Sequence, residues 1–421
     1  MNEQQVETLA SEQPDIKKIR EDFPMLQKTI DGKQLIYLDS AATGQKPEVV
    51  MKRLYQYYTE EYAKPKEAHS LSQQTTKELE DVRSKVASFI GADSGEEIVF
   101  SRGCTESINM VAGGFGRSLL KEGDEIVITQ LEHHANIIPW QIACEQSGAK
   151  IKVVPIDSNC ELDIDAYRKI LSSKTKVVAF LHSSHVLGTL LPAKQLIEIA
   201  HEKDIPVMVD GAQTAPHMPV NMKDLDCDFY TFSGHKMGSP SGVGILYGKK
   251  EWLKKSPPFE GGGDMAEKVT FEDFKPAAIP HKFEAGTMPF AEIIAFGTLL
   301  DYLSELNMEH TAAYEQELLS YATEQLSQVE DVTIFGTSTD KEPVLSFNIK
   351  NKDVKKLEKF LNDAYNITTR AGVLSAQPLM KVLGIDGLLR LSFCYYNTKE
   401  EIDTCIGAIE EFIKSPSSKW E

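Results

Sequence analysis

Residues 175–210 read TKVVAFLHSSHVLGTLLPAKQLIEIAHEKDIPVMVD, and this segment indicates the class of fold. It opens with the apolar run 175–181 and closes with a second one, 205–210. The segment 193–204 between them has the pattern of a helix. Because both runs are apolar on their two faces, they predict central strands of a sheet that is covered on both sides. The stretch therefore predicts a β-α-β unit of a parallel sheet.

Similar runs recur on both sides of this unit. They lie at residues 96–100, 124–129, 150–156, 229–233 and 244–248, with a further helical pattern at 105–120. Together these runs predict an α/β domain with a mostly parallel sheet of about seven strands.

The alternation ends at residues 257–280, which are rich in Gly and Pro. Beyond them the apolar-periodic stretch 291–306 predicts a long helix, and 344–350 and 388–396 predict strands of a smaller α+β region. A two-domain arrangement of this kind usually binds its ligand in the cleft between the domains. We expect an N-terminal segment at 1–24 that packs with the small domain, a large domain at 25–290 and a small C-terminal domain at 291–421.

Composition and charge exclude several classes of protein. The 421 residues carry 45 Lys and Arg against 63 Asp and Glu, a net charge of −18, which repels nucleic acid and anionic lipid. No stretch approaches the ~18 apolar residues of a membrane-spanning helix, and the N-terminal sequence lacks the order of a signal peptide. The six cysteines form no CxxC pair, so neither a metal site nor a disulfide framework is expected. We therefore expect a cytoplasmic protein that binds neither nucleic acid nor membranes.

Two charged residues are placed at neighbouring strand ends. The run 207–213 ends a strand at Asp210, and Lys236 follows the next strand within 232–244. Such side chains meet at the edge of the sheet where α/β proteins bind ligands. By itself the pair could be an ordinary salt bridge. No GxGxxG follows the first strand and no GxxxxGK[ST] occurs, so dinucleotide and P-loop sites are not expected.

Two further segments add to this pair. SRGCTES (101–107) opens a helix whose free N–H groups could hold a phosphate. LEHHAN (131–136) places His133 and His134 directly after a strand. Together, a lysine, an aspartate, a histidine and a phosphate cradle describe a site for pyridoxal phosphate (PLP).

A colinear series of motifs runs over nearly the whole chain. It comprises IYLDSAAT (36–43), RGCTESINMVA (102–112), LEHHANIIPWQ (131–141), HVLGT (185–189), VDGAQTAPHMPV (209–220), CDFYTFSGHKM (227–237), FEGGGDM (259–265), KFEAGT (282–287), RAGVLSAQPLM (370–380) and RLSFCYYNTKEEID (390–403). In these motifs the chain resembles the class V aminotransferase-fold enzymes, most closely the group II (SufS-type) cysteine desulfurases. The resemblance implies the PLP-dependent transferase fold type I, with the large domain as the PLP-binding one.

The resemblance also implies roles for the matching residues. Lys236 would bind PLP covalently and move protons at the substrate carbon, Asp210 would pair with the pyridinium nitrogen, and His133 would stack on the ring. The remaining cofactor contacts would come from Gln213 at the phenolic oxygen, from Thr105, Ser233 and His235 at the phosphate, from Cys104 beside them, and from Thr287 across the interface of a homodimer.

The substrate implied by the resemblance is a small L-amino acid. Arg390 would clamp its carboxylate with a bidentate guanidinium, and Ala41 and Arg370 would complete the substrate site.

The sequence departs from the family pattern at RAGVLSAQPLM. Ser375 stands where the desulfurases have the cysteine that accepts the substrate sulfur, and Val373 and Leu374 replace two histidines. The pKa of a serine hydroxyl lies far above the value of about 8.5 of a thiol. An alcohol also cannot carry a persulfide sulfur. The defining step of the desulfurases therefore lacks its usual nucleophile.

Other departures surround the same pocket. His185 replaces an asparagine close to the phenolic oxygen of the cofactor, where it could act as an additional acid–base group. The entrance segment AKPKEAH offers Lys64 and Lys66 in place of an arginine. Cys104 replaces a threonine and could be an alternative thiol.

We therefore expect a PLP-dependent lyase that eliminates a β-substituent, such as a thiol, from a small L-amino acid. Ser375 and His185 join Lys236, His133 and Asp210 as its expected catalytic residues. One alternative is a cysteine desulfurase that uses another thiol. Others are an aminotransferase, an epimerase or a decarboxylase, and an inactive PLP-binding paralogue, against which the intact site residues argue.

Overall fold

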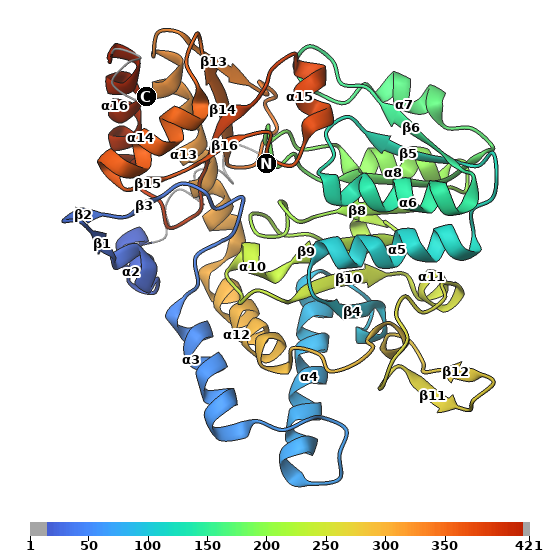
Figure 1. Ribbon diagram of the computed structural model, residues 1–421. Coiled ribbons are helices and arrows are strands. Elements are labelled where there is room, and N and C mark those ends of the chain that lie inside the picture. Colours follow the sequence, from blue (N-terminus) through green and yellow to red (C-terminus); the bar gives the residue numbers. More distant parts are fainter. Residues whose placement is uncertain (1–14, 416–421) are drawn as a thin grey trace.

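A seven-stranded sheet forms the centre of the larger domain in the computed structural model, which describes residues 15–415 (Figure 1). Its strands, in spatial order, are β4 (Ile98–Ser101), β10 (Gly244–Gly248), β9 (Phe229–Ser233), β8 (Val207–Asp210), β7 (Thr175–Leu181), β5 (Glu125–Thr129) and β6 (Lys150–Val154). β10 is antiparallel to both of its neighbours, and all other pairs are parallel. Each strand falls on a run that the sequence predicts, so the mostly parallel α/β sheet is confirmed.

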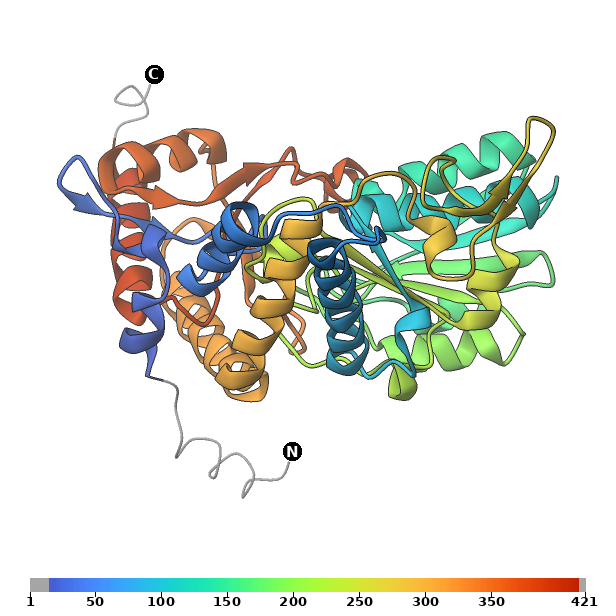
Figure 2. The same cartoon turned by 90° about the horizontal axis from the view of Figure 1, so that it is seen from below.

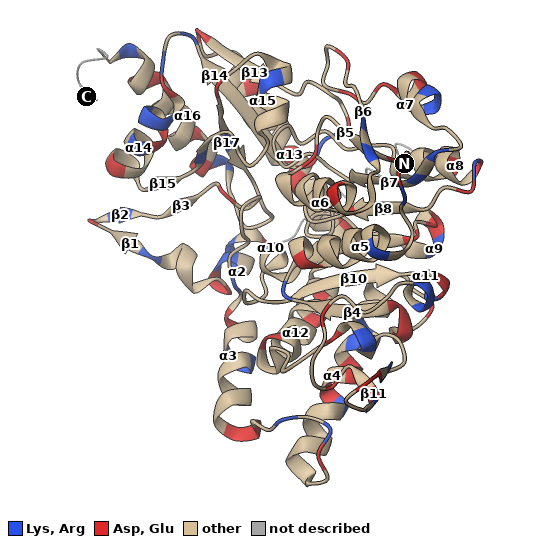
Figure 3. Cartoon of the chain, turned by 45° about the vertical axis from the view of Figure 1, so that its right-hand side comes forward, with Lys and Arg blue, Asp and Glu red and all other residues tan. Residues whose placement is uncertain are grey.

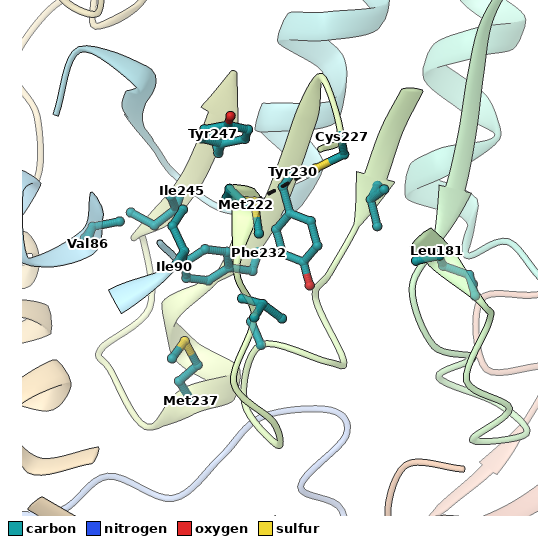
Figure 4. Packing of buried hydrophobic residues seen from close by; sticks show 14 of the residues in the cluster. Val86, Ile90, Leu181, Met222, Cys227, Tyr230, Phe232, Met237, Ile245 and Tyr247 are labelled. Carbon is teal, nitrogen blue, oxygen red and sulfur yellow. Dashed lines mark hydrogen bonds between the residues drawn. The ribbon is translucent and has the colours of Figure 1, made fainter. Parts of the chain in front are cut away.

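Successive side chains of the central strands pack on opposite faces of this sheet. Val178 of β7 belongs to one apolar cluster and Val177 to another. Figure 4 shows part of the first cluster, in which Ile245 lies near Val86 and Tyr230 lies beside Phe232. Burial on both faces explains why these strands appear in the sequence as continuous apolar runs.

Helices cover both faces of the sheet. α5 (Cys104–Ser118) and α6 (Ile138–Ser147) pack on one face, and α4 (Ser70–Phe89), α7 (Ile164–Ile170), α8 (Ala193–His201) and α12 (Phe290–Leu306) contribute to the cluster on the other.

The parallel register brings three strand ends together. Leu181 lies opposite Asp210, and Asp210 lies opposite Thr231. The carboxyl ends of β7, β8 and β9 therefore form one edge, where the loops after these strands can meet.

The smaller domain has its own sheet and its own apolar cluster. The strand order is β13 (Val332–Phe335), β14 (Val344–Ile349), β17 (Leu388–Ser392) and β16 (Arg370–Gly372), all antiparallel. Its helices are α13 (Met308–Ser327), α14 (Val354–Tyr365), α15 (Gln377–Leu383) and α16 (Lys399–Lys414). The strand predicted at 388–396 ends at Ser392, because the Cys394 N–H donates to the Asn397 side chain and the chain turns there.

The helix α12 begins where we expect the small domain to start, yet it packs with the large domain. It lies between α4 and α3 (Glu48–Gln56), as Figures 1 and 2 show. Its buried side chains, among them Ile294 and Leu299, share the cluster of the large sheet. The domain boundaries themselves stay predictions.

The N-terminal part of the chain joins the small domain. β3 (Ile36–Tyr37) pairs in parallel with β15 (Ile367–Thr368). Arg20 in α2 (Ile16–Glu21) forms an ion pair with Glu401 of α16 at 2.8 Å. Residues 1–14 of the expected N-terminal segment lie outside the described part of the chain.

The other elements are short. They include β1 (Thr29–Ile30), β2 (Lys33–Gln34), α9 (Met222–Leu225), α10 (Gly234–Met237), α11 (Lys250–Lys255) and the hairpin of β11 (Ala266–Val269) and β12 (Phe274–Pro276). No helix within residues 15–415 combines the length and apolar character needed to cross a membrane. Lys and Arg lie interspersed among Asp and Glu over both domains (Figure 3).

Candidate active site

A cavity of about 240 Å³ lies at the carboxyl edge of the large sheet, between the two domains. Every site residue predicted from the sequence except Thr287 lines it: Ala41, Cys104, Thr105, His133, His185, Asp210, Gln213, Ser233, His235, Lys236, Arg370, Ser375 and Arg390. Residues far apart in the sequence thus surround one space.

Asp210 is the last residue of β8 and is fixed from two sides. Its Oδ1 accepts hydrogen bonds from the Ala212 N–H at 3.0 Å and from the Cys104 thiol at 3.1 Å. Burial, followed by the nearby Asp210, raises the pKa of the Cys104 thiol well above its usual value. The thiol is therefore a hydrogen-bond donor at neutral pH.

Lys236 lies in the one-turn helix α10, which follows β9. Burial lowers the pKa of its amine, although Asp210 acts in the opposite direction. The backbone is crowded here: a Cβ at Gly44 would lie 2.4 Å from the Lys236 carbonyl oxygen, so only glycine fits at that position. A buried amine with a lowered pKa is suited to covalent chemistry with a carbonyl group.

An anion site lies at the start of α5. Gly103 precedes this helix with φ of 157° and, as a glycine, has no side chain that could cap the first turn. The Cys104 N–H donates to Ser233 Oγ at 2.8 Å, and Thr105 lines the cavity. Free N–H groups at a helix N-terminus favour a phosphate.

His235 borders the same side of the cavity. Its Nδ1 lies 3.1 Å from Thr43 Oγ1. Burial, followed by the charge of Lys236, lowers its pKa to about 4, so the ring is neutral at physiological pH.

His133 and His185 lie edge to face, with their ring centroids 4.7 Å apart. His133 Nδ1 accepts from the Ala135 N–H at 3.0 Å, which leaves the proton of the neutral ring on Nε2. Burial, with Lys236 next in effect, lowers the pKa of His133 to about 4. His185 Nε2 lies 2.8 Å from the carbonyl oxygen of Leu374.

Arg390 is buried and partly paired within the chain. One guanidinium nitrogen donates to Asp39 Oδ1 and another to the His185 carbonyl oxygen, each at 2.8 Å. Its Nε has no partner among the described residues. Arg370 lies directly opposite Arg390 in the pairing of β16 with β17. Two guanidinium groups therefore border the cavity, where they can bind a carboxylate.

The loop before α15 carries Ser375. Leu374 and Ser375 have φ of 51° and 56°, in the left-handed region that residues other than glycine rarely adopt. The His134 N–H donates to the Ser375 carbonyl oxygen at 3.0 Å, and His134 Nε2 accepts from the Gln377 N–H at 3.3 Å.

Thr287 and the two lysines of the entrance segment lie elsewhere. Thr287 is exposed in the loop before α12 and does not line this cavity, so its expected contact across a dimer interface stays a prediction. Lys64 lies 3.6 Å from Asp264 in an ion pair, and neither it nor Lys66 lines the cavity.

No group of three or more His, Cys, Asp or Glu side chains within residues 15–415 is arranged to hold a metal.

Some lining residues were not predicted from the sequence, among them Leu181 and Ser183. Leu181 is the last residue of β7 and lies opposite Asp210 in the sheet, and Ser183 follows just after the strand ends. The strand-end argument that finds Asp210 would also have found them.

The donor set fits PLP. An amine, a fixed carboxylate and the N-terminus of a helix converge on one cavity, and each can serve a different part of that cofactor. All six cysteines are free, and Cys104 is the one that lines the cavity.

Comparisons with known proteins agree with this geometry. Residues 36–405 match the family model described as aminotransferase class-V. A cysteine desulfurase of Synechococcus elongatus is 44% identical over 396 residues, which cover 94% of this chain and 63% of that protein. The chain thus spans about three fifths of that relative. A cysteine desulfurase of Pectobacterium atrosepticum is 43% identical over 94% of this chain and 97% of its own.

Solved structures give the same result. The crystal structure of the cysteine desulfurase CsdA from Escherichia coli superposes with a TM-score of 0.88 at 35% identity, covering 95% of this chain and 99% of that one.

Proposed function

Because this chain belongs to the class V aminotransferase family and is a PLP-dependent enzyme, we propose that it eliminates a β-substituent from a small L-amino acid. The bond broken would join the β-carbon to sulfur or to another leaving group. The observation that carries the proposal is Ser375, which lines the cavity in the loop where the related desulfurases are expected to carry a thiol. The assignment to group II of these enzymes is part of the proposal.

Residues of this chain would hold the cofactor as the sequence suggests. The first turn of α5 and Ser233 would bind the phosphate, Asp210 the ring nitrogen and Lys236 the carbonyl carbon. His133, neutral because its pKa is near 4, would lie against the ring without adding charge. PLP, when bound, supplies an electron sink next to the substrate Cα.

The proposed step is a proton removal followed by loss of the leaving group. The Lys236 amine, whose pKa is lowered by burial, takes the Cα proton. The β-substituent departs with its bonding electron pair, and the resulting aminoacrylate is hydrolysed to pyruvate and ammonium. Arg390 holds the substrate carboxylate, using the Nε that no described residue occupies.

No group in the cavity is suited to accept the substrate sulfur and carry it as a persulfide. The Ser375 hydroxyl is a poor nucleophile and cannot carry sulfur. The Cys104 thiol is engaged with Asp210, and its raised pKa keeps it protonated. The buried Leu374 also makes this wall apolar, which favours a less polar side chain than that of cysteine.

A second candidate is a cysteine desulfurase. The names of the relatives, at 44% identity over 94% of the chain, favour it. In that case the sulfur would pass to Cys104 or to an external thiol. Aminotransferase and epimerase reactions share the same proton removal, whereas a decarboxylase would instead break the bond between Cα and the carboxylate, and no contact in the cavity favours any of the three.

We also propose a cytoplasmic homodimer that binds no nucleic acid. Exposed apolar side chains on and beside α3, such as Val49, Met51 and Tyr55, support a second copy as partner. Thr287 would then contribute to the site of the other subunit.

Product analysis with the PLP-loaded protein tests the proposal. With L-cysteine or an S-alkyl cysteine we expect pyruvate and no alanine. Ser375→Cys restores a thiol and should yield alanine with protein-bound sulfur, whereas Ser183→Cys, a thiol elsewhere in the same cavity, should not. Alanine from the wild type that disappears in Cys104→Ala would instead establish the desulfurase.

A further inference from the structure

The loop that carries Ser375 has a backbone that its own sequence does not favour. Leu374 and Ser375 both lie in the left-handed region, and neither is Gly, Asn or Asp. Leu374 is nevertheless buried, with 5% of its surface exposed. Such a conformation persists only where surrounding contacts hold it. The loop must therefore be held by residues outside it.

Two histidines of the large domain provide these contacts. The backbone N–H and the ring of His134 bind Ser375 and Gln377 on the far side of the loop. His185 Nε2 contacts the carbonyl oxygen of Leu374 at 2.8 Å. The main chain of His134 thus holds Ser375, and the side chain of His185 holds Leu374, the other residue in the left-handed region.

The contact defines the protonation state of His185. A carbonyl oxygen only accepts hydrogen bonds, so Nε2 carries the proton and Nδ1 the lone pair. Burial lowers the pKa of His185 well below its usual value, and His133, Arg390 and Lys236 lower it further. The ring is therefore neutral, and its one proton is used by the Leu374 carbonyl.

The main chain of His185 is bound to the small domain. Its carbonyl oxygen accepts from Arg390 at 2.8 Å, and the next carbonyl, of Val186, accepts from the Ser346 hydroxyl. One residue thus connects the Ser375 loop with the arginine expected to bind the substrate carboxylate.

We propose that His185 is a positioning residue that holds the 373–376 loop in the cavity at a fixed place relative to Arg390. Its role is to donate one hydrogen bond to Leu374, not to exchange protons with the substrate. The inference rests on the proposed use of this loop as a wall of the substrate pocket.

A pair of variants separates positioning from acid–base chemistry. In His185→Gln the amide nitrogen can occupy the place of Nε2 and still donate, but it does not titrate. In His185→Asn the shorter side chain does not reach that place. Amide hydrogen exchange over residues 372–377 is measured in each holoenzyme, after thermal unfolding shows that both variants are folded. We expect exchange about fivefold faster in the Asn variant and the wild-type rate in the Gln variant.

Three outcomes would overturn the proposal: wild-type exchange in both variants, equal loss of protection in both, or loss of one limb of the pH profile of kcat/KM in the Gln variant. The last result would identify His185 as an acid–base group. Because hydrogen exchange does not depend on which product forms, failure of the proposed lyase reaction would leave this measurement unchanged.

Discussion

The thiol of Cys104 donates a hydrogen bond to Asp210, with Sγ 3.1 Å from Oδ1. The aspartate expected at the ring nitrogen of PLP is thus oriented by the first residue of α5, whose N–H groups border the expected phosphate site. Orientation of the carboxylate and binding of the phosphate therefore depend on the same helix.

Cys104→Ala should weaken PLP binding by roughly tenfold, because Asp210 loses one of its two donors. Cys104→Ser keeps a donor of similar size and serves as the control. Titration of the apo-protein with PLP, followed by absorbance, gives the dissociation constants. Equal affinities of the Ala variant and the wild type would show that the thiol does not orient Asp210.

Borohydride should fix the cofactor on the peptide that contains Lys236, and Lys236→Ala should abolish the fixation. The reason is the lowered pKa of the buried Lys236 amine. Lys46 is a suitable control, because burial lowers its pKa to about 8 while it lies outside the cavity lining. Peptide mass analysis is the measurement, and a labelled Lys46 peptide would contradict the assignment.

Arg390→Lys should raise KM for the amino-acid substrate by roughly tenfold to hundredfold, with a smaller effect on kcat. Two different guanidinium nitrogens bind Asp39 and the His185 carbonyl, and a lysine, whose donors all lie on one nitrogen, cannot reach both and also offer the planar pair of donors that fits a carboxylate. Steady-state kinetics, with Arg370→Lys for comparison, measure the change. A fall in kcat at constant KM would place Arg390 outside substrate binding.

Glu284→Gln should destabilise the protein by roughly 3 kcal/mol at pH 7. Burial alone would raise the pKa of Glu284, but Arg83, His281 and the Phe100 N–H together lower it to about 2. A carboxyl group whose pKa is lower in the folded state stabilises the protein at pH values above the pKa that this side chain has in the unfolded chain, near 4.5. This stabilisation is lost as the pH falls towards 2.

Urea unfolding of both proteins at several pH values measures this difference. Glu80→Gln is the matched control: Glu80 also contacts Arg83, at 3.0 Å, but 47% of its side chain is exposed. The Glu80→Gln substitution should lower the free energy of unfolding by less than about 1 kcal/mol. A pH-independent difference for Glu284→Gln would exclude the ionised pair as its cause.

Much of the large domain is predictable because burial on two faces leaves apolar runs such as 175–181. The same runs reveal where strands end, and so which polar residues, Asp210 and Lys236 among them, gather at one edge. The apolar run of β10 does not show that this strand is antiparallel to its neighbours. The direction of β10 depends on how the chain returns to the sheet after α10.

Other features depend on contacts between distant parts of the chain. β3 and β15 have two residues each, too few for any periodic pattern, and they form by pairing with each other. α12 is apolar enough for either domain, and only its packing against α3 and α4 decides. The bond from His185 to Leu374 requires two loops to meet, which residue types alone do not specify.

The ion pair between Asp39 and Arg390 joins residues 351 positions apart in the chain. As the chain is synthesised, Asp210 and Lys236 are made well before Arg390, so the cofactor-facing side of the cavity can assemble first. The wall made by the small domain can close only when β17 has been translated and has met the segment after β3. Closing so long a loop is entropically costly. Completion of the substrate pocket therefore comes late in synthesis, and a chain that ends before β17 would keep the groups expected to bind the cofactor but lack the arginine expected to bind substrate.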